Sequence, residues 1–114
     1  MEENIKNSDI FERVLKGQCK INNISTRKPK VENINNLIVV SVKNHLKEGV
    51  DFECFKILNL IYQIISPIGV KFNQQLYLYP DSKRVDRVTV SFEVEEYKRL
   101  NNELNLLLGI ENHN

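Results

Sequence analysis

The most regular hydrophobic pattern in the chain lies at residues 52–65, FECFKILNLIYQII, where apolar side chains recur at helical spacing. Phe52 and Phe55 begin an apolar ridge, and further apolar side chains flank it, so that only a narrow polar stripe remains. Asp51 has the chemistry of an N-cap, and Pro67 prevents the helix from continuing. The pattern predicts a core helix whose outer flank needs a second apolar surface to cover it.

Helical periodicity also occurs nearer to both ends of the chain. Residues 9–16 place their apolar side chains on one face and are followed by Gly17, which predicts a short helix that stops there. Residues 95–108 predict a longer helix, in which Glu95 can form an i,i+4 ion pair with Arg99. This last helix carries a seam of apolar side chains at spacings of three and four residues, formed by Tyr97, Leu100, Leu104 and Leu107.

The remaining patterns are those of strands and loops. Residues 37–42, LIVVSV, predict a strand buried on both faces, while the alternation at 18–24 predicts a weak edge strand. The polar residues 25–36 predict a loop. Residues 70–79 and 88–94 alternate on either side of the turn PDSKR, which predicts a β-hairpin. The half-buried first strand of this hairpin places four apolar residues on one side, namely Val70, Phe72, Leu76 and Leu78.

The elements follow one another in the order α-β-β-α-β-β-α, which predicts an α+β fold. We expect a two-layer α/β sandwich in which helices cover one face of a mixed or mainly antiparallel sheet of three to four strands. The central helix would form a right-handed crossover, and a ferredoxin-like arrangement or a circular permutation of one fits the same order. Residues 1–114 form a single domain, with residues 1–7 and 110–114 expected to be frayed.

Net charge and hydropathy limit the classes of partner. The formal net charge is +1, so attraction to nucleic acid would require a local basic patch. The central helix is shorter than the roughly 20 apolar residues that span a bilayer, and the N-terminal residues do not resemble a signal peptide. We therefore expect a cytoplasmic protein without a membrane partner.

The cysteine and histidine positions give no indication of a metal site. Cys19 and Cys54 are far apart, and neither His45 nor His113 lies at zinc-ligand spacing from them. The first interpretation is two buried reduced thiols, and the alternative is a disulfide between them, as occurs inside hyperthermophiles. With no glycine-rich phosphate loop either, we expect no cofactor, no metal and no small-molecule ligand.

Basic residues form two clusters, one before and within the loop at 25–36 and one in the hairpin turn. Such clusters could follow a phosphate backbone, and the alternative is an ordinary solvated surface. The candidate nucleic-acid-binding residues are Lys20, Arg27, Lys28, Lys30, Lys83, Arg84 and Arg87.

Carboxylates offer an enzymatic interpretation, because clustered Asp and Glu hold Mg²⁺ in many nucleases and hydrolases. The available cluster consists of Asp81, Asp86, Glu93, Glu95 and Glu96. Each of these has an ordinary role in a turn, on an outward strand position or in a first helical turn. We therefore assign no catalytic residues and rank a metal-dependent hydrolase or nuclease third.

Self-association is the remaining class. The central helix needs cover on two flanks, and the seam of the last helix is a second apolar surface. A homodimer through the seam residues Tyr97, Leu100, Leu104 and Leu107, or through an exposed strand edge, would bury these surfaces. In the alternative, the first and last helices cover everything within one chain.

The composition is rich in Asn, Ile and Lys and contains no Ala. In this composition, and in the stretches KGQCKINNISTRKPKVEN and LNLIYQIISPIGVKF, the chain resembles the small proteins of crenarchaeal rod-shaped viruses, the rudiviruses. This resemblance implies expression in the cytoplasm of a hyperthermophilic host, and it carries over no catalytic residues. Our first hypothesis is an accessory protein that acts by binding, as a homodimer. The second is a sequence-independent nucleic-acid-binding protein.

Overall fold

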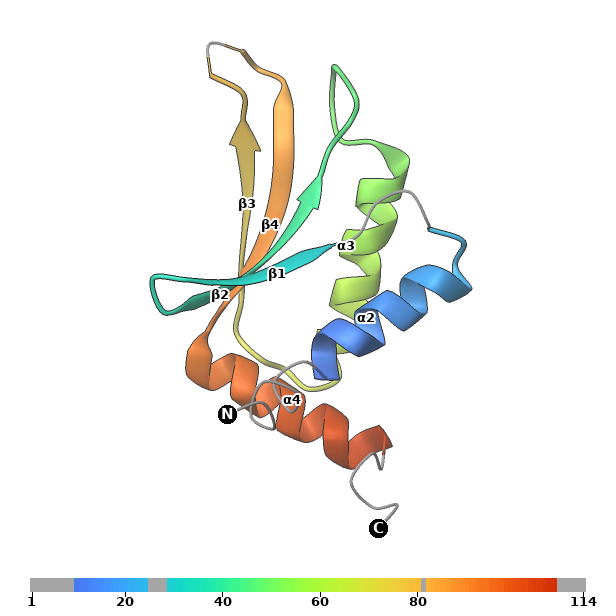
Figure 1. Cartoon of the computed structure of the whole chain (residues 1–114), viewed down its shortest axis with the longest axis vertical. Helices are drawn as coiled ribbons and strands as arrows, with labels where there is room; N and C mark the ends of the chain where they lie inside the picture. The colour runs from blue at the N-terminus through green and yellow to red at the C-terminus, as the bar shows by residue number, and fades with distance from the viewer. Residues whose placement is uncertain (1–9, 25–28, 81, 109–114) are drawn as a thin grey trace.

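The computed structural model describes residues 10–24, 29–80 and 82–108. Its elements are α2 (Ile10–Ile21), β1 (Lys30–Ile34), β2 (Leu37–Lys43), α3 (Phe52–Ile65), β3 (Asn73–Leu78), β4 (Val85–Glu93) and α4 (Val94–Leu108). The four strands form one antiparallel sheet, and the helices pack on one of its faces (Figure 1). The predicted α+β class and order of elements are therefore confirmed. The fraying expected at 1–7 and 110–114 lies outside the described residues.

Helix α3 begins and ends where its sequence predicts. The Asp51 carboxylate accepts a hydrogen bond from the Cys54 amide at 2.8 Å, which satisfies one of the free N–H groups of the first turn. After the helix, Gly69 adopts a φ of 75° and its N–H donates to the carbonyl of Ile65 at 2.9 Å. Because such a left-handed backbone favours glycine, the chain turns away at this residue.

Helix α2 is longer than predicted, and the strand predicted at 18–24 is wrong. The helix continues through Gly17, which therefore does not stop it, and buries Cys19 on the same face as the preceding core residues. It ends instead at Ile21, and the chain turns away at Asn23, which has a φ of 60°, while the N–H of Ile24 donates to the Cys19 carbonyl at 2.8 Å. This is a Schellman motif with asparagine in the left-handed position, and the buried Cys19 and Ile24 are its hydrophobic pair.

Strand β1 lies in the stretch predicted to be a loop, so the prediction for 25–36 is wrong for Lys30–Ile34, while Asn35 and Asn36 do form a turn and residues 25–28 lie outside the described residues. β1 forms a hairpin with β2, closed by Asn35 and Asn36 with φ values of 52° and 65°. Two successive residues with positive φ are typical of the type I′ turn, which asparagine tolerates and which matches the twist of the strands. β1 is largely exposed at the sheet edge, which explains its polar sequence.

The sheet has the strand order β1-β2-β4-β3, so β4 lies between β2 and β3. The expected connection through the central helix therefore joins two parallel strands that are not neighbours. In order and direction the strands match a circularly permuted ferredoxin-like sheet, in which the edge strand β1 precedes β2 along the chain. β3 occupies the opposite edge.

The hydrophobic core lies between the sheet and the three described helices. An aromatic cluster joins the N-terminal helix, the sheet and the C-terminal helix, since the rings of Phe11, Phe92 and Tyr97 lie 5.8 to 6.0 Å apart. Beside it, the buried Asn101 side chain accepts from the Phe11 amide at 2.7 Å, and so satisfies a free N–H in the first turn of α2. α2 thus covers both α3 and α4 (Figure 1).

A buried polar network holds the loop between β2 and α3. The side-chain amide of Asn44, which is 1% exposed, donates to the carbonyls of Gly49 and Val85 at 2.9 and 3.1 Å. Its oxygen accepts from the Asp51 amide at 2.7 Å, and the Asp51 carboxylate accepts from the His45 amide at 2.8 Å. The cap of α3 is therefore tied to the start of β4 through one asparagine.

Candidate interaction surfaces

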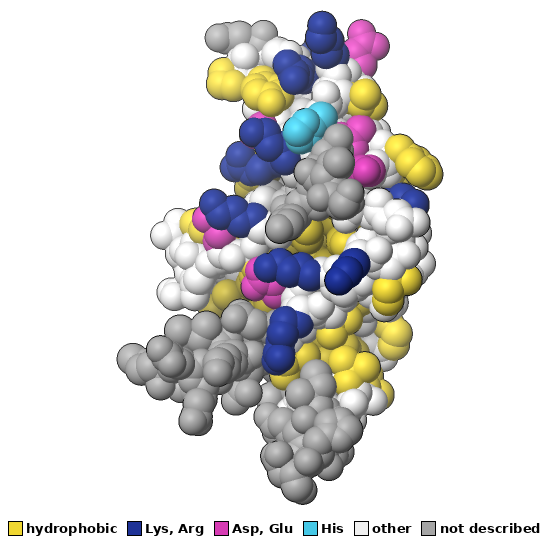
Figure 2. Space-filling model, turned by 45° about the vertical axis from the view of Figure 1, so that its right-hand side comes forward, with side chains coloured by type: hydrophobic (Ala, Val, Ile, Leu, Met, Phe, Trp, Pro, Cys, Tyr) yellow, Lys and Arg dark blue, Asp and Glu magenta, His cyan; other side chains and the backbone are white. Residues whose placement is uncertain are grey.

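The predicted basic residues do not form one patch. Lys20 is exposed on α2, in the helical layer, whereas Lys30 and Arg87 lie on the opposite face of the sheet. Lys83 and Arg84 lie in the β3–β4 turn, and the Arg84 guanidinium is 4.6 Å from the centre of the Tyr79 ring. Arg27 and Lys28 are outside the described residues. Figure 2 shows Lys and Arg side chains spread along the visible face and adjacent to acidic side chains at several points.

The apolar seam of α4 belongs mainly to the core of the single chain. Tyr97, Leu100 and Leu104 are only 4%, 0% and 6% exposed, because they pack against the sheet and α2. Leu107 is the exception, with 69% of its surface exposed near the end of the helix. An interface between copies would therefore need side chains other than the first three.

The apolar side of β3 is exposed, contrary to the half-buried pattern predicted for it. Val70 is buried before the strand begins, but Phe72, Leu76 and Leu78 are 40%, 54% and 54% exposed. Helix α3 packs mainly over β2 and leaves the edge strand without a cover. All six residues of β3 are exposed as a result.

An apolar groove of about 330 Å³ lies between α3 and β3. Phe55 and Leu76, both more than half exposed, line it together with Leu58 and Tyr62. Burial raises the pKa of the Tyr62 phenol, whose ring packs against that of Phe72. The predicted ridge of α3 is thus rotated, because the fully buried side is centred on its isoleucines and its phenylalanines lie at the groove or in solvent.

We call the sheet face opposite the helices the open face. It carries a hollow of about 570 Å³. Lys43, Arg87 and Tyr77 form one row across β2, β4 and β3. The next row across the sheet consists of Lys30, Ser41, Thr89 and Gln75. Thr89 is only 3% exposed although no described helix covers it, so it forms part of the floor of the hollow.

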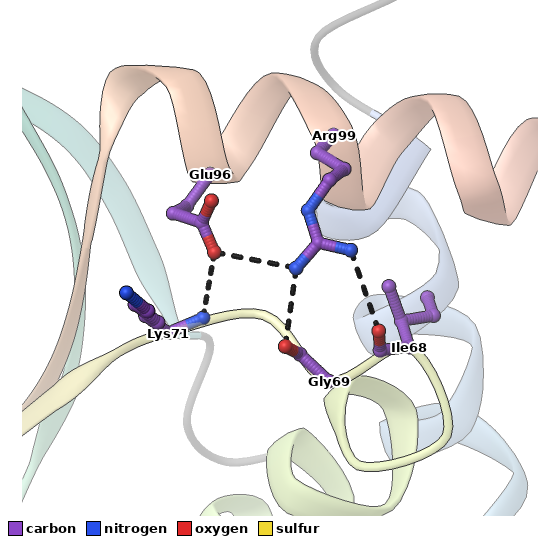
Figure 3. Close-up of polar contacts among 5 residues, drawn as sticks. All are labelled: Ile68, Gly69, Lys71, Glu96 and Arg99. Atoms are coloured by element: carbon purple, nitrogen blue, oxygen red, sulfur yellow. Dashed lines mark hydrogen bonds and ion pairs between the residues drawn. The ribbon is translucent and has the colours of Figure 1, made fainter.

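A polar clamp joins the first turn of α4 to the connection between α3 and β3 (Figure 3). Glu96 accepts from the Lys71 amide at 2.8 Å, and Arg99 donates to the Gly69 carbonyl at 3.1 Å and to Glu96 at 3.4 Å. Arg99 therefore pairs with Glu96 and not with Glu95 as predicted. The Lys71 N–H, and next Arg99, lower the pKa of the Glu96 carboxyl. Both side chains of the clamp already have backbone partners, which gives it a structural role.

The described carboxylates do not gather into one cluster, although Glu93 and Glu96 line the same hollow. Asp86 pairs with Arg87 at 3.0 Å, Glu93 is exposed at the end of β4, and Asp81 lies outside the described residues. In the described part of the chain, no three His, Cys, Asp or Glu side chains gather in a way that could hold a metal ion.

Cys19 and Cys54 are both buried thiols, as the first interpretation predicts. The Cys54 thiol donates to the Val42 carbonyl at 3.8 Å, and burial raises the pKa of Cys19.

In the described residues, the fold defines a small α+β protein with exposed edge strands, an apolar groove beside β3 and an open sheet face. No protein-family model, curated protein or solved structure shows a significant match to the chain. Among the described helices, none combines the length and apolar character needed to cross a membrane. The function must therefore be argued from these surfaces.

Proposed function

We propose that this protein acts by binding rather than by catalysis, and that it forms a homodimer along the edge of β3. The observation that carries the proposal is the uncharged sequence of this edge strand, NQQLYL, in which every residue is exposed. An edge strand presents unpaired backbone groups, which proteins usually protect with charges, proline or bulges. The other edge has such charges, Lys30 and Glu32, whereas the irregularity in β3 lies only at its end, between Tyr77 and Leu78.

The alternation of side chains restricts the pairing register. Residues opposite each other in an antiparallel pair lie on the same face, so a two-fold axis must pass through a residue position. The two positions at the middle of β3 are Gln75 and Leu76. With the axis at Gln75, Leu76 lies opposite Gln74 of the other copy. With the axis at Leu76, the two Leu76 residues lie opposite each other. Leu76 therefore lies one residue from the axis in the first register and on the axis in the second, and no like charges meet within the strand.

The apolar groove supports the same partner. A two-fold axis perpendicular to the sheet keeps both helical layers on one face, so the grooves of the two copies would adjoin over Leu76 and Phe55. Because these side chains are 54% and 63% exposed, covering four of them would contribute roughly 4–7 kcal/mol before association is counted. Backbone pairing adds to this, and association itself costs at least about 4 kcal/mol. We expect a dimer that dissociates on dilution.

Sedimentation velocity over a range of protein concentrations tests the proposal. The wild-type chain should shift from monomer to dimer as its concentration rises. Leu76→Lys places a charge at the middle of the edge strand, opposite or close to the same lysine of the other copy. The two like charges repel each other, so the variant should be a folded monomer. A wild-type chain that stays monomeric at millimolar concentration would contradict the proposal.

Leu107→Lys is the matched control. Leu107 is more exposed than Leu76 and is the accessible member of the seam at which the sequence places an interface. The variant introduces the same charge on α4 and should keep the wild-type dimer. Dissociation by Leu107→Lys, with Leu76→Lys still dimeric, would move the interface to the end of α4.

We place the protein in the cytoplasm, and in that of the host cell if its resemblance to rudivirus proteins reflects its origin. Both cysteines are present as thiols, which supports a reducing compartment. Thiol alkylation in intact cells, followed by mass spectrometry of the denatured chain, should find both cysteines reduced.

A further inference from the structure

The open face combines charge and an aromatic ring in one row, and no described helix covers it. Lys43 and Arg87 lie directly opposite each other on β2 and β4, and Tyr77 follows Arg87 across the sheet. Like charges that face each other across two strands are unfavourable on their own. A bound anion would relieve this repulsion, so the row favours a negatively charged ligand.

The neighbouring acidic residues neutralise only part of this charge. Asp86 pairs with Arg87 at 3.0 Å, and Glu32 pairs with Lys30 at 3.4 Å. Lys43 has no ion pair among the described residues. The hollow is therefore positive on balance, with Lys43 able to accept a new partner and Arg87 retaining further N–H donors.

Arg87 also lies over the ring of Tyr77, and we call this pair the platform. The guanidinium carbon lies 4.7 Å from the ring centre, and the Tyr77 hydroxyl donates to Gln75 at 2.9 Å, which holds the ring along the strand. Tyr77 is 40% exposed. Bases that are not paired in a duplex stack on aromatic rings and on arginine planes of this kind.

The floor of the hollow supplies neutral polar groups. Ser41 and Thr89 carry hydroxyls at facing positions of β2 and β4, and Gln75 continues the row on β3. Hydroxyls and amides can bond to base edges or sugars without adding charge. The open face thus offers cations for phosphates, a platform for a base and polar groups between them.

We propose that the open face binds single-stranded nucleic acid, with phosphates held by Lys43, Arg87 and Lys30 and a base stacked on the Arg87–Tyr77 platform. Duplexes are disfavoured because their bases are already stacked and cannot reach the platform. A plot of the logarithm of the binding constant against the logarithm of the salt concentration has a slope of roughly −0.7 per phosphate contact for a single strand. Three contacts therefore predict a slope of about −2. The site lies on the opposite sheet face from the apolar groove and does not require the dimer.

Fluorescence anisotropy with labelled oligo-dT and oligo-U of about 12 nucleotides, within the usual single-strand site sizes, tests the proposal. A duplex of the same length is the third probe, and all three are titrated over a series of salt concentrations. The double variant Lys43→Gln/Arg87→Gln should weaken single-strand binding about tenfold or more and reduce the slope to roughly −0.7. Lys56→Gln/Lys98→Gln removes the same charge from the helical side and should bind like the wild type.

Three results would overturn the proposal: no saturable binding by the wild type at low salt, equal weakening by the two double variants, or tighter binding of the duplex. Circular dichroism must show that both double variants are folded. Sedimentation of the same samples separates this site from the proposed dimer, since a monomeric chain can retain the open face and a dimer can fail to bind nucleic acid.

Discussion

Asn44→Ala should be among the most destabilising single substitutions in this chain. The Asn44 side chain is 1% exposed and bridges three parts of the molecule. Two of its hydrogen bonds are fully buried, one from the Asp51 amide at 2.7 Å and one to the Val85 carbonyl at 3.1 Å. Alanine would leave both partners without a bond and away from water.

The magnitude follows from those two orphaned groups. Each buried polar group that loses its partner costs about 1–3 kcal/mol, so the expected loss is about 2–6 kcal/mol. A domain of this size is stable by about 5–15 kcal/mol, so the loss is a large fraction of the total. Because Asp51 also caps α3, Asp51→Ala should disturb the same network, and the double variant should lose less than the sum of the single losses.

Urea unfolding followed by far-ultraviolet circular dichroism, at one fixed protein concentration, measures these differences. Asn102→Ala is the control, because Asn102 is exposed on α4 and its replacement should change the free energy of unfolding by less than about 0.5 kcal/mol. If Asn44→Ala lowered the free energy by less than about 1 kcal/mol, the network would not have the role inferred for it.

Three further predictions concern acid stability, thiol reactivity and the contact between α2 and α4. The pKa of Glu96 is lowered, first by the Lys71 N–H, so its carboxylate stabilises the folded chain at every pH above the range in which a glutamate ordinarily titrates. That stability is lost as the pH falls through the lower folded-state value, and thermal unfolding of Glu96→Gln should depend less steeply on acid than that of the wild type. Cys19 and Cys54 are buried, so an aromatic disulfide reagent should label them slowly in native buffer and rapidly in guanidinium; rapid native labelling would contradict their burial. Asn101→Ala removes the side-chain oxygen that accepts from the Phe11 amide in the first turn of α2. In urea unfolding it should lower the free energy of unfolding by about 1–3 kcal/mol. A change no larger than that of Asn102→Ala would refute this.

Local sequence predicted the bounds of α3, β2 and α4 closely, because the signals for these bounds are local. The burial predicted on both faces of β2 is wrong, since only its helix-facing Val40 and Val42 are buried. The bounds of α3 follow from Asp51 at its start and Gly69 after its end. The β-branched run of β2 and the 3,4 spacing of α4 likewise specify their own periodicity. These elements need no knowledge of the rest of the chain to be recognised.

The errors arise where two local signals compete. The alternation of Cys19 and Ile21 has the period of a strand. The helical spacing of Leu15 and Cys19 prevails, because it buries these two side chains in the core. Packing therefore extended α2 beyond its glycine. β1 was missed because an exposed edge strand needs few apolar residues, although the pair Asn35 and Asn36 is a recognisable hairpin signal.

The candidate surfaces depend on contacts between distant segments. Sequence identified Lys30 and Arg87 as basic residues, but it could not bring them to one face or place Lys43 opposite Arg87, because register between strands distant in sequence depends on the tertiary pairing. It also placed Leu100 and Leu104 at an interface that the packing of α2 and the sheet fills within the chain.

Periodicity along the chain thus determined most of the helices and strands, with β1 and the end of α2 as the exceptions, and it determined which side chains seek burial. Only tertiary structure decided which of those side chains find cover. With β4 inserted between β2 and β3, α3 packs over the inner strands, and Leu76 and Phe55 remain exposed at an uncharged edge. The physical reason is that burial depends on the area that neighbouring elements can cover, and this area follows from strand order.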